Sequence, residues 1–440
     1  MKPGGRRPIG TRTAQGQLGA YRDVLALVTA LTLLQGAMAA VSVVMSLSLL
    51  KAGVGASGIG LVASAYSAGF LAGTLIAPLE IARIGHIRAF TLLAGVAALV
   101  ALSLPVVRAS VPGWAILLSL AGLAASGMLT AGESWIANAA PPQSRGAILG
   151  FYHMVSKAGA IAAPFLVASA MSGLAVFMLV AAFFIAALLP IAATNRSQPA
   201  LFAASPFGPR RLLRAAPASV FAALCAGAVN NSVAQLYPVY AADFQPGDPA
   251  GFAARLNGAI LIGAMLGLWP IGLLSDKLDR RLVIAGAAAL GAAAAVGLAV
   301  FAGANSQGIV LLFAGIFGAG SLSYYAVAVA NAADRARPED ITSMMAGILV
   351  IWGAGSIAGP PVAGALMQVL PGASGLFIFA SLALGLLCVT CLSRIAISPP
   401  VPADAREPFG VSPATSLAIA GIDPRGDAQQ PDLFSAPAAN

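Results

Sequence analysis

The stretch SGMLTAGESWIANAAPPQSRGAILGFYHMVSKAGAIAAPFLVASAM, Ser126 to Met171, decides the fold. It contains the end of one apolar helix, a short turn and most of a second apolar helix, which Lys157 interrupts. A related stretch, VANAADRARPEDITSMMAGILVIWGAGSIAGPPVAGALM, runs from Val329 to Met367 and repeats the ANAA turn and the AGxIAxP core. The two copies lie about half a chain apart, which predicts a duplicated helical bundle.

The composition places this bundle in a membrane. The chain has 440 residues, of which 59% are hydrophobic and 9% are charged, and its mean hydropathy is +0.89. Soluble domains carry about 25% charged residues. The basic residues behind the net charge of +9 are scattered between apolar runs, so we expect a lipid bilayer and no nucleic acid as partner. Cys225, Cys388 and Cys391 lie inside apolar runs, which favours packing over disulfides.

Twelve apolar runs have about the roughly 20 residues that cross a hydrocarbon core. They predict an all-α membrane protein with twelve transmembrane helices in two pseudo-symmetric six-helix bundles. The expected helices are Val24–Leu50, Ser57–Leu79, Ile87–Val107, Gly113–Asn138, Arg145–Met171, Leu174–Ala193, Pro217–Ala242, Phe252–Ser275, Leu282–Gly303, Gly308–Asn331, Ile341–Leu370 and Ser374–Arg394. The expected organisation is a disordered basic tail (1–23), an N-terminal bundle (24–193), a cytoplasmic linker (194–216), a C-terminal bundle (217–395) and a disordered C-terminal tail (396–440).

The basic residues also predict an orientation. Lys51, Arg108 and Arg255 are the basic residues of one set of loops, whereas the tails, the linker and the opposite loops contain nearly all the others. Because Lys and Arg concentrate on the cytoplasmic side, we expect both termini in the cytoplasm. The apolar run after residues 1–22 is too long for a cleavable signal peptide.

Two loop motifs resemble those of a known family. GLLSDKLDRR, Gly272 to Arg281, is similar to the G-x-x-x-D-[RK]-x-G-R-[RK] loop of the major facilitator superfamily, with Asp279 in the place of a glycine. PLEIARIGHIR, Pro78 to Arg88, is the matching loop of the first half, with Ala82 in the place of the acid. ESW at 133–135, RGAILGFY at 145–152 and PED at 338–340 further resemble the YcaD-like bacterial branch.

The resemblance covers residues 24–395 and implies the superfamily fold in a bacterial cytoplasmic (inner) membrane. It implies that the first, fourth, seventh and tenth helices line a central cavity. It also implies secondary active transport of a small molecule by alternating access, although the branch does not indicate which molecule. The alternative is a non-transporting sensor or partner-binding protein on the same fold.

The loop motif predicts a gating cluster on the cytoplasmic face. Asp276 ends an expected helix, where it can accept hydrogen bonds from the N-terminus of a neighbouring helix. The basic residues beside it can meet acids and stabilise one of two states. Ordinary positive-inside charge also explains those basic residues, but it does not explain the acid. The expected coupling and gating residues of these loops are Gly272, Asp276, Lys277, Arg280, Arg281 and, in the degenerate first copy beside Glu80, Arg83.

Lys157 is the most unusual residue of the spans. Counting about 1.5 Å per residue from Arg145 places it about 18 Å inside the cytoplasmic boundary, near the midplane of a roughly 30 Å core. Its counterpart in the repeat is Gly353. A charge at this depth is expensive, so we predict that Lys157 faces the cavity and recognises an anionic or electron-rich substrate group. Structural pairing with a carbonyl or a carboxylate, and snorkelling, are the alternatives.

Glu133 and His153 are the titratable residues nearest to Lys157. His153 lies one turn nearer the cytoplasm on the same helix face, and Glu133 lies about 7 Å inside the boundary. We expect one of them to couple transport to the proton gradient. The alternatives are a hydrogen-bonded structural histidine, and a salt bridge from Glu133 to Arg83 or Arg145.

Neutral polar residues complete the expected cavity, with hydrogen bonding between helices as the alternative. The sequence contains no P-loop, metal-ligand cluster or catalytic triad, so we expect no cofactor, no metal and no enzymatic activity, in a monomer. The expected helices contain further neutral polar residues, namely Tyr237, Tyr240 and Asn331. The cavity candidates besides Lys157 and His153 are Gln35, Tyr66, Asn230, Asn231, Gln235, Tyr324, Tyr325 and Trp352.

Overall fold

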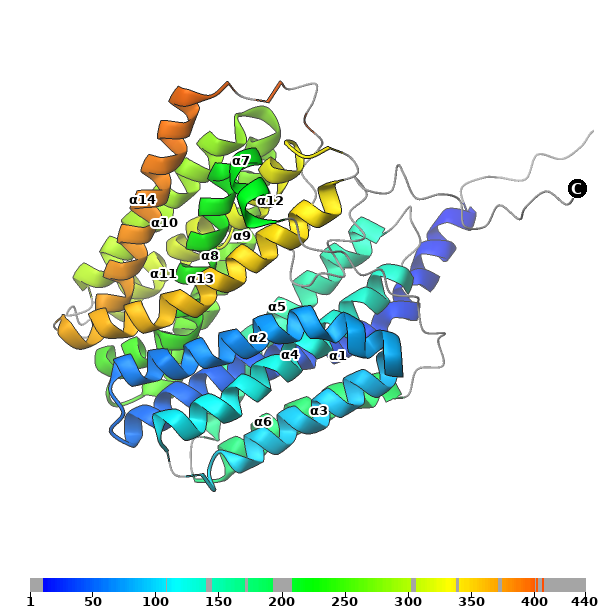
Figure 1. Ribbon diagram of the computed structural model, residues 1–440. Coiled ribbons are helices and arrows are strands. Elements are labelled where there is room, and N and C mark those ends of the chain that lie inside the picture. Colours follow the sequence, from blue (N-terminus) through cyan, green and yellow to red (C-terminus); the bar gives the residue numbers. More distant parts are fainter. Residues whose placement is uncertain are drawn as a thin grey trace, which may run out of the picture.

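The computed structural model describes residues 11–107, 109–139, 145–170, 173–192, 208–301, 306–337, 340–370, 374–399, 401–402 and 406. All regular structure in this part of the chain is helical, and Figure 1 shows its arrangement. The helices are α1 (Thr11–Lys51), α2 (Ala56–Ile84), α3 (His86–Ser103), α4 (Val111–Ala139), α5 (Arg145–Ser169), α6 (Ala175–Ala192), α7 (Pro209–Ala215), α8 (Pro217–Phe244), α9 (Pro249–Lys277), α10 (Arg280–Val300), α11 (Gln307–Ser321), α12 (Tyr324–Ala333), α13 (Ile341–Val369) and α14 (Gly375–Ile397).

Twelve helical segments of the described chain are long and apolar enough to cross a membrane, which confirms the predicted fold class. One of them, Gln307–Ala333, combines α11 and α12, so the single helix expected at Gly308–Asn331 is broken. Hydroxyls beside the break bond to neighbouring helices. Ser321 donates to Asn230 Oδ1 at 2.7 Å, and Ser323 contacts the carbonyl of Ala264 at 3.5 Å. Such contacts satisfy polar groups where a membrane helix is interrupted.

The ends of the expected segments differ from the structure. Helix α1 begins at Thr11, inside the tail expected to be disordered (1–23), because no proline interrupts residues 11–23. The expected linker (194–216) contains the short helix α7. Residues 1–10 and 193–207, and most of the expected C-terminal tail (396–440), lie outside the described residues.

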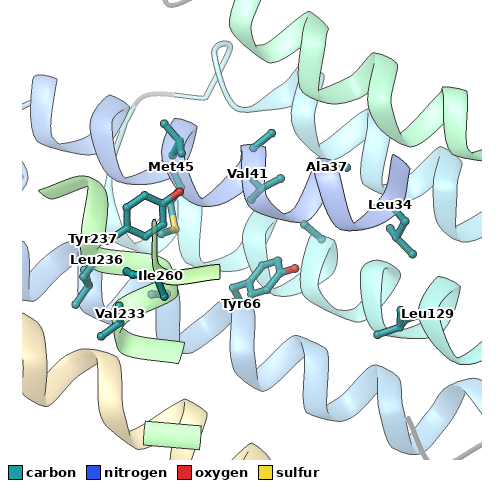
Figure 2. Close-up of a cluster of buried hydrophobic side chains, with 14 of the residues drawn as sticks. Leu34, Ala37, Val41, Met45, Tyr66, Leu129, Val233, Leu236, Tyr237 and Ile260 are labelled. Atoms are coloured by element: carbon teal, nitrogen blue, oxygen red, sulfur yellow. The ribbon is translucent and has the colours of Figure 1, made fainter. Parts of the chain in front are cut away.

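Helices α1 to α6 form one bundle and α8 to α14 the other, drawn in Figure 1 from blue to teal and from green to orange. The bundles meet where α2 packs on α13 and α5 packs on α9. A buried apolar cluster extends through both bundles. Figure 2 shows part of this cluster, in which side chains of α1, α2 and α4 lie with those of α8 and α9.

Small residues set the distances between neighbouring helices. A Cβ atom added at Gly69 of α2 would collide with the carbonyl oxygen of Ser119, and one added at Gly122 of α4 would collide with that of Tyr66. The backbones of α2 and α4 therefore touch, as small residues allow in membrane proteins. This contact places α4 behind α2.

Candidate functional site

A cavity of about 200 Å³ lies between the two bundles. Residues of α1, α2, α5, α8, α9 and α13 form its wall. Tyr66 and Tyr237, both drawn in Figure 2, belong to this wall. The lining residues are Gln35, Met38, Ala39, Ser42, Tyr66, Ser67, Phe70, Ala160, Asn231, Ala234, Gln235, Tyr237, Asn257, Leu261, Trp352 and Ser356.

Five of the expected cavity residues belong to this wall: Gln35, Tyr66, Asn231, Gln235 and Trp352. The other five do not line it: Lys157, His153, Asn230, Tyr324 and Tyr325. The fourth and tenth spans, α4 and α11–α12, contribute no lining residue among the described ones, in contrast to the layout implied by the resemblance. Helices α2 and α13 take their place, because close backbone contact holds α4 behind α2.

The five expected residues outside the wall have other surroundings. Asn230 accepts the hydrogen bond of Ser321, Tyr324 is fully buried, and the ring of Tyr325 lies 6.4 Å from that of Trp352. His153 lies beside Tyr152, with ring centroids 4.5 Å apart. Lys157 is half-buried, one turn of α5 before the lining residue Ala160, and is not itself a residue of this wall.

Several lining residues were not among the cavity residues expected from the sequence. Asn257 is an isolated amide in the apolar run Phe252–Ser275, and this isolation is the signal that could have identified it. Ser42, Ser67 and Ser356 carry a weaker signal, because serines are common in membrane helices and usually bond to their own backbone.

Glu133 of α4 is fully buried and forms the centre of a hydrogen-bonded group behind the cavity wall. Its Oε1 accepts a 2.8 Å hydrogen bond from the hydroxyl of Tyr152. Gln35, a residue of the cavity wall, lies near that hydroxyl. Lys157 is near enough to interact electrostatically with Glu133. A path of side chains therefore joins the buried acid to the cavity.

The alternative partners suggested for Glu133 lie elsewhere. Arg83 pairs with Glu80 at 3.6 Å on an exposed surface, and the side chain of Arg145 lies outside the described part of the chain. Tyr152, which was not among the expected site residues, forms the hydrogen bond to Glu133. Its signal was the tyrosine at the end of RGAILGFY, immediately before His153.

The arginines of the loop motif are bound within the second bundle. Arg280 Nε lies 2.9 Å from Asp334 Oδ2, with side chains 1% and 3% exposed. Arg281 pairs with Asp279 at 2.7 Å and donates to the carbonyls of Arg394 and Ser398. These contacts hold α10 to the end of α12 and to α14. In this conformation they join parts of one bundle and do not connect the two bundles.

The remaining expected gating residues occupy the same end of the second bundle. Gly272 is buried and its carbonyl accepts from Ser275, whereas Asp276 and Lys277 are exposed. Burial raises the pKa of Asp279, but the hydrogen bonds and the positive charge of Arg281 outweigh it, so the pKa of this carboxyl lies below its usual value.

Hydrogen bonds between the bundles gather on one side of the molecule, which we call the closed side. Ser46 donates to the carbonyl of Gln235 at 2.5 Å, and Ser64 to that of Ile357 at 2.6 Å. Further bonds of this group run from Ser42 to the carbonyl of Ala234, from Asn231 to Ser67 and from Asn257 to the carbonyl of Ala160. All these residues lie at the middle of their helices or towards the loops at 52–55, 245–248 and 370–374.

The fold and the cavity define a class of protein: a multi-pass membrane protein in which two helical bundles enclose a polar site. The family model of the Major Facilitator Superfamily matches residues 25–269 and 221–422. The chain belongs to the Major Facilitator Superfamily, whose members are generally not enzymes.

Individual relatives agree with this family. The chain is 30% identical to the uncharacterised MFS-type transporter YcaD of Salmonella typhimurium over 362 residues, which cover 79% of this chain and 89% of the relative. Its fold is similar to that of the nucleoside transporter NupG (TM-score 0.69, 12% identity, 84% of this chain and 99% of that one). It is also similar to a D-xylose-proton symporter (TM-score 0.65, 14% identity, 88% and 99%). Together these similarities support a secondary transporter.

Proposed function

We propose that the protein carries a small molecule across a bacterial inner membrane by alternating access, and that protons drive the transport. The observation that carries the proton coupling is the fully buried Glu133, which accepts a hydrogen bond from Tyr152 close to Gln35 of the cavity wall. The name of the structural neighbour that is a D-xylose-proton symporter agrees with this coupling.

Glu133 suits proton coupling because its two protonation states differ strongly in cost inside a membrane. An ionised carboxylate in an apolar interior is expensive unless other groups compensate it, whereas a protonated carboxyl is neutral. The ionised form accepts the hydrogen bond of Tyr152, and the protonated form can donate one instead. Proton binding therefore changes the hydrogen bonding of Tyr152, which lies near Gln35 of the cavity wall.

The hydrogen bonds between the bundles on the closed side support alternating access. By the positive-inside rule the loops at 52–55, 245–248 and 370–374 face the outside, and both termini face the cytoplasm. The hydrogen bonds between the bundles then close the external entrance, and this conformation is the inward-facing one. Rocking of one bundle against the other must break these bonds to open the external entrance.

Transport and coupling can be tested in proteoliposomes loaded with a pH-sensitive dye. Uridine, D-xylose, nicotinamide and nicotinate would be added one at a time with the outside more acidic, and dye and radiolabel uptake would be followed together. We expect uptake of at least one compound together with protons, and its loss on adding a proton ionophore. Uptake that is unchanged by the ionophore would refute the coupling. The absence of uptake for every small molecule would refute transport.

Two glutamates allow a matched comparison in this assay. Glu133→Gln removes the buried carboxylate and should abolish the proton dependence. Glu80→Gln removes an exposed carboxylate, 47% accessible, and should leave it unchanged. Equal effects of the two substitutions would exclude Glu133 as the coupling residue.

A further inference from the structure

We propose that the cavity binds an uncharged, planar molecule that donates hydrogen bonds, such as a heteroaromatic amide or a nucleobase, and not the anion expected from Lys157. This inference rests on the proposed transport function for its biological role. Binding of such a molecule to the cavity can be measured without any transport.

The charge of the ligand follows from the cavity wall. Among the described residues, the lining contains no Asp, Glu, Lys, Arg or His. Lys157 lies one turn away from the lining residue Ala160, and Glu133 lies behind Tyr152. A charged ligand would lose its hydration here without meeting an opposite charge in the wall, which is strongly unfavourable. A neutral ligand avoids this loss.

The hydrogen-bonding character of the ligand follows from the amides of the wall. Asn231 uses its NH₂ group to donate to Ser67 at 2.7 Å and to the carbonyl of Ser356 at 2.9 Å. Asn257 uses its NH₂ group to donate to the carbonyl of Ala160 at 3.0 Å. Reversing either amide would place its oxygen against a carbonyl oxygen, so these contacts fix both orientations. The oxygens of both amides are thus left as acceptors.

Two further groups of the wall have unused hydrogen-bonding capacity. Gln235 is 7% exposed and Tyr237 is 2% exposed. Neither Gln235 Oε1 nor the Tyr237 hydroxyl has a hydrogen-bond partner in the described part of the chain. Buried polar groups normally have partners, and an unpaired one is unfavourable by about 1–3 kcal/mol. Both atoms are covered by protein in this conformation, so a ligand reaches them only when the side chains turn towards it. Together with the amide oxygens of Asn231 and Asn257 they form a set of unpaired groups, which a ligand that supplies N–H or O–H donors suits.

The shape and size of the cavity narrow the class of ligand further. Tyr66, Phe70 and Trp352 contribute aromatic surface to the same wall, and flat rings pack well against such surface. An apolar cavity of about 150 Å³ can hold benzene. By this comparison the volume of about 200 Å³ suits one substituted ring of roughly ten heavy atoms.

The test uses ligands that share a ring and differ in charge. Nicotinamide, nicotinate and 3-picolylamine form one neutral, anionic and cationic set; benzamide, benzoate and benzylamine form a second; uracil and adenine are further neutral planar probes. The full-length protein in detergent would be titrated with each while its thermal unfolding is followed, since a bound ligand raises the midpoint by mass action. We expect a neutral planar probe to bind at least tenfold more tightly than its charged counterparts.

Substitutions locate the binding. Gln235→Leu should weaken binding of the neutral probe roughly tenfold, because a ligand donor then lacks its acceptor. Gln368→Leu, a change of the same kind at an exposed position of α13, should not weaken it. Lys157→Met should also leave neutral binding unchanged, and this variant keeps the proposal testable even if the Gln235 variant does not fold.

The outcomes separate this inference from the proposed function. Tighter binding of nicotinate or benzoate, lost in Lys157→Met, would overturn it in favour of an anion, and failure of every neutral probe at millimolar concentration would also overturn it. Neutral binding without any transport would refute the proposed function and leave the inference standing. Proton-driven uptake of an ion would refute this inference and leave the proposed transport function standing.

Discussion

Replacing Tyr152 by phenylalanine tests the link between the buried acid and the cavity. The hydroxyl donates a 2.8 Å hydrogen bond to Glu133 Oε1, and both side chains are fully buried. A hydrogen bond to a charged group contributes about 1.5–3 kcal/mol. Since about 1.4 kcal/mol corresponds to one pH unit, its loss is equivalent to about 1–2 pH units. The hydroxyl stabilises the ionised carboxylate, and Tyr152→Phe removes this contribution.

The assay is the pH profile of proton-driven uptake in proteoliposomes. If the protonated form of Glu133 is needed, uptake decreases as the pH rises, and Tyr152→Phe should move the half-maximal pH upward by about 1–2 units. Tyr240→Phe is the matched control, because its buried hydroxyl donates at 2.9 Å to the carbonyl of Leu298 in the second bundle, away from any carboxylate. An unchanged midpoint in Tyr152→Phe, or an equal shift in Tyr240→Phe, would refute the reasoning.

Three further substitutions test stability and gating. Arg280→Met removes the buried ion-pair partner of Asp334 and should destabilise the protein by about 3–5 kcal/mol, measured by thermal unfolding in detergent; a midpoint like that of the parent would contradict the importance of this pair. Asp279→Asn should be less stable than the parent at pH 7. A carboxyl whose pKa is lowered in the folded protein stabilises the fold at pH values above its usual pKa of 3.8, and it loses this contribution as the pH falls through the folded pKa. The difference should therefore shrink as the pH falls below about 3.8 and disappear below the lower folded pKa, and a difference that does not shrink would show another cause. In Gly60→Val the new side chain would collide with the backbone of Pro360 on the closed side, so the distance between spin labels on α2 and α13 should increase, and an unchanged distance would contradict the assignment of that side.

The spans could be predicted because each one is a local property of the chain. About 20 apolar residues must form a helix inside lipid, since no water is there to satisfy the backbone. Twelve such runs therefore predicted twelve spans, and the described part of the chain has twelve helical segments long and apolar enough to be spans. The break between α11 and α12 could not be predicted in this way, because it depends on partners in other helices such as Asn230 and Ala264.

The loop motif was a second local signal, but its contacts were not local. The sequence identified Arg280 and Arg281 as part of a cytoplasmic cluster. Only the packing of α10 against α12 and α14 brings Arg280 to Asp334, and Arg281 to the carbonyl groups of Arg394 and Ser398. The sequence predicted that these arginines meet acids, but it did not predict which ones.

The sequence by itself determined the number of spans, the polar residues inside them and, through the constant helical rise, how deep each one lies. It could not determine which residues of a helix face the cavity, because that depends on how each helix is rotated and packed. Close contact between α2 and α4 excludes α4 from the wall, and Ala160 lines the cavity while Lys157, one turn away, does not. Depth is a property of one helix, whereas membership of the site depends on six helices packed together, so only the tertiary structure decided it.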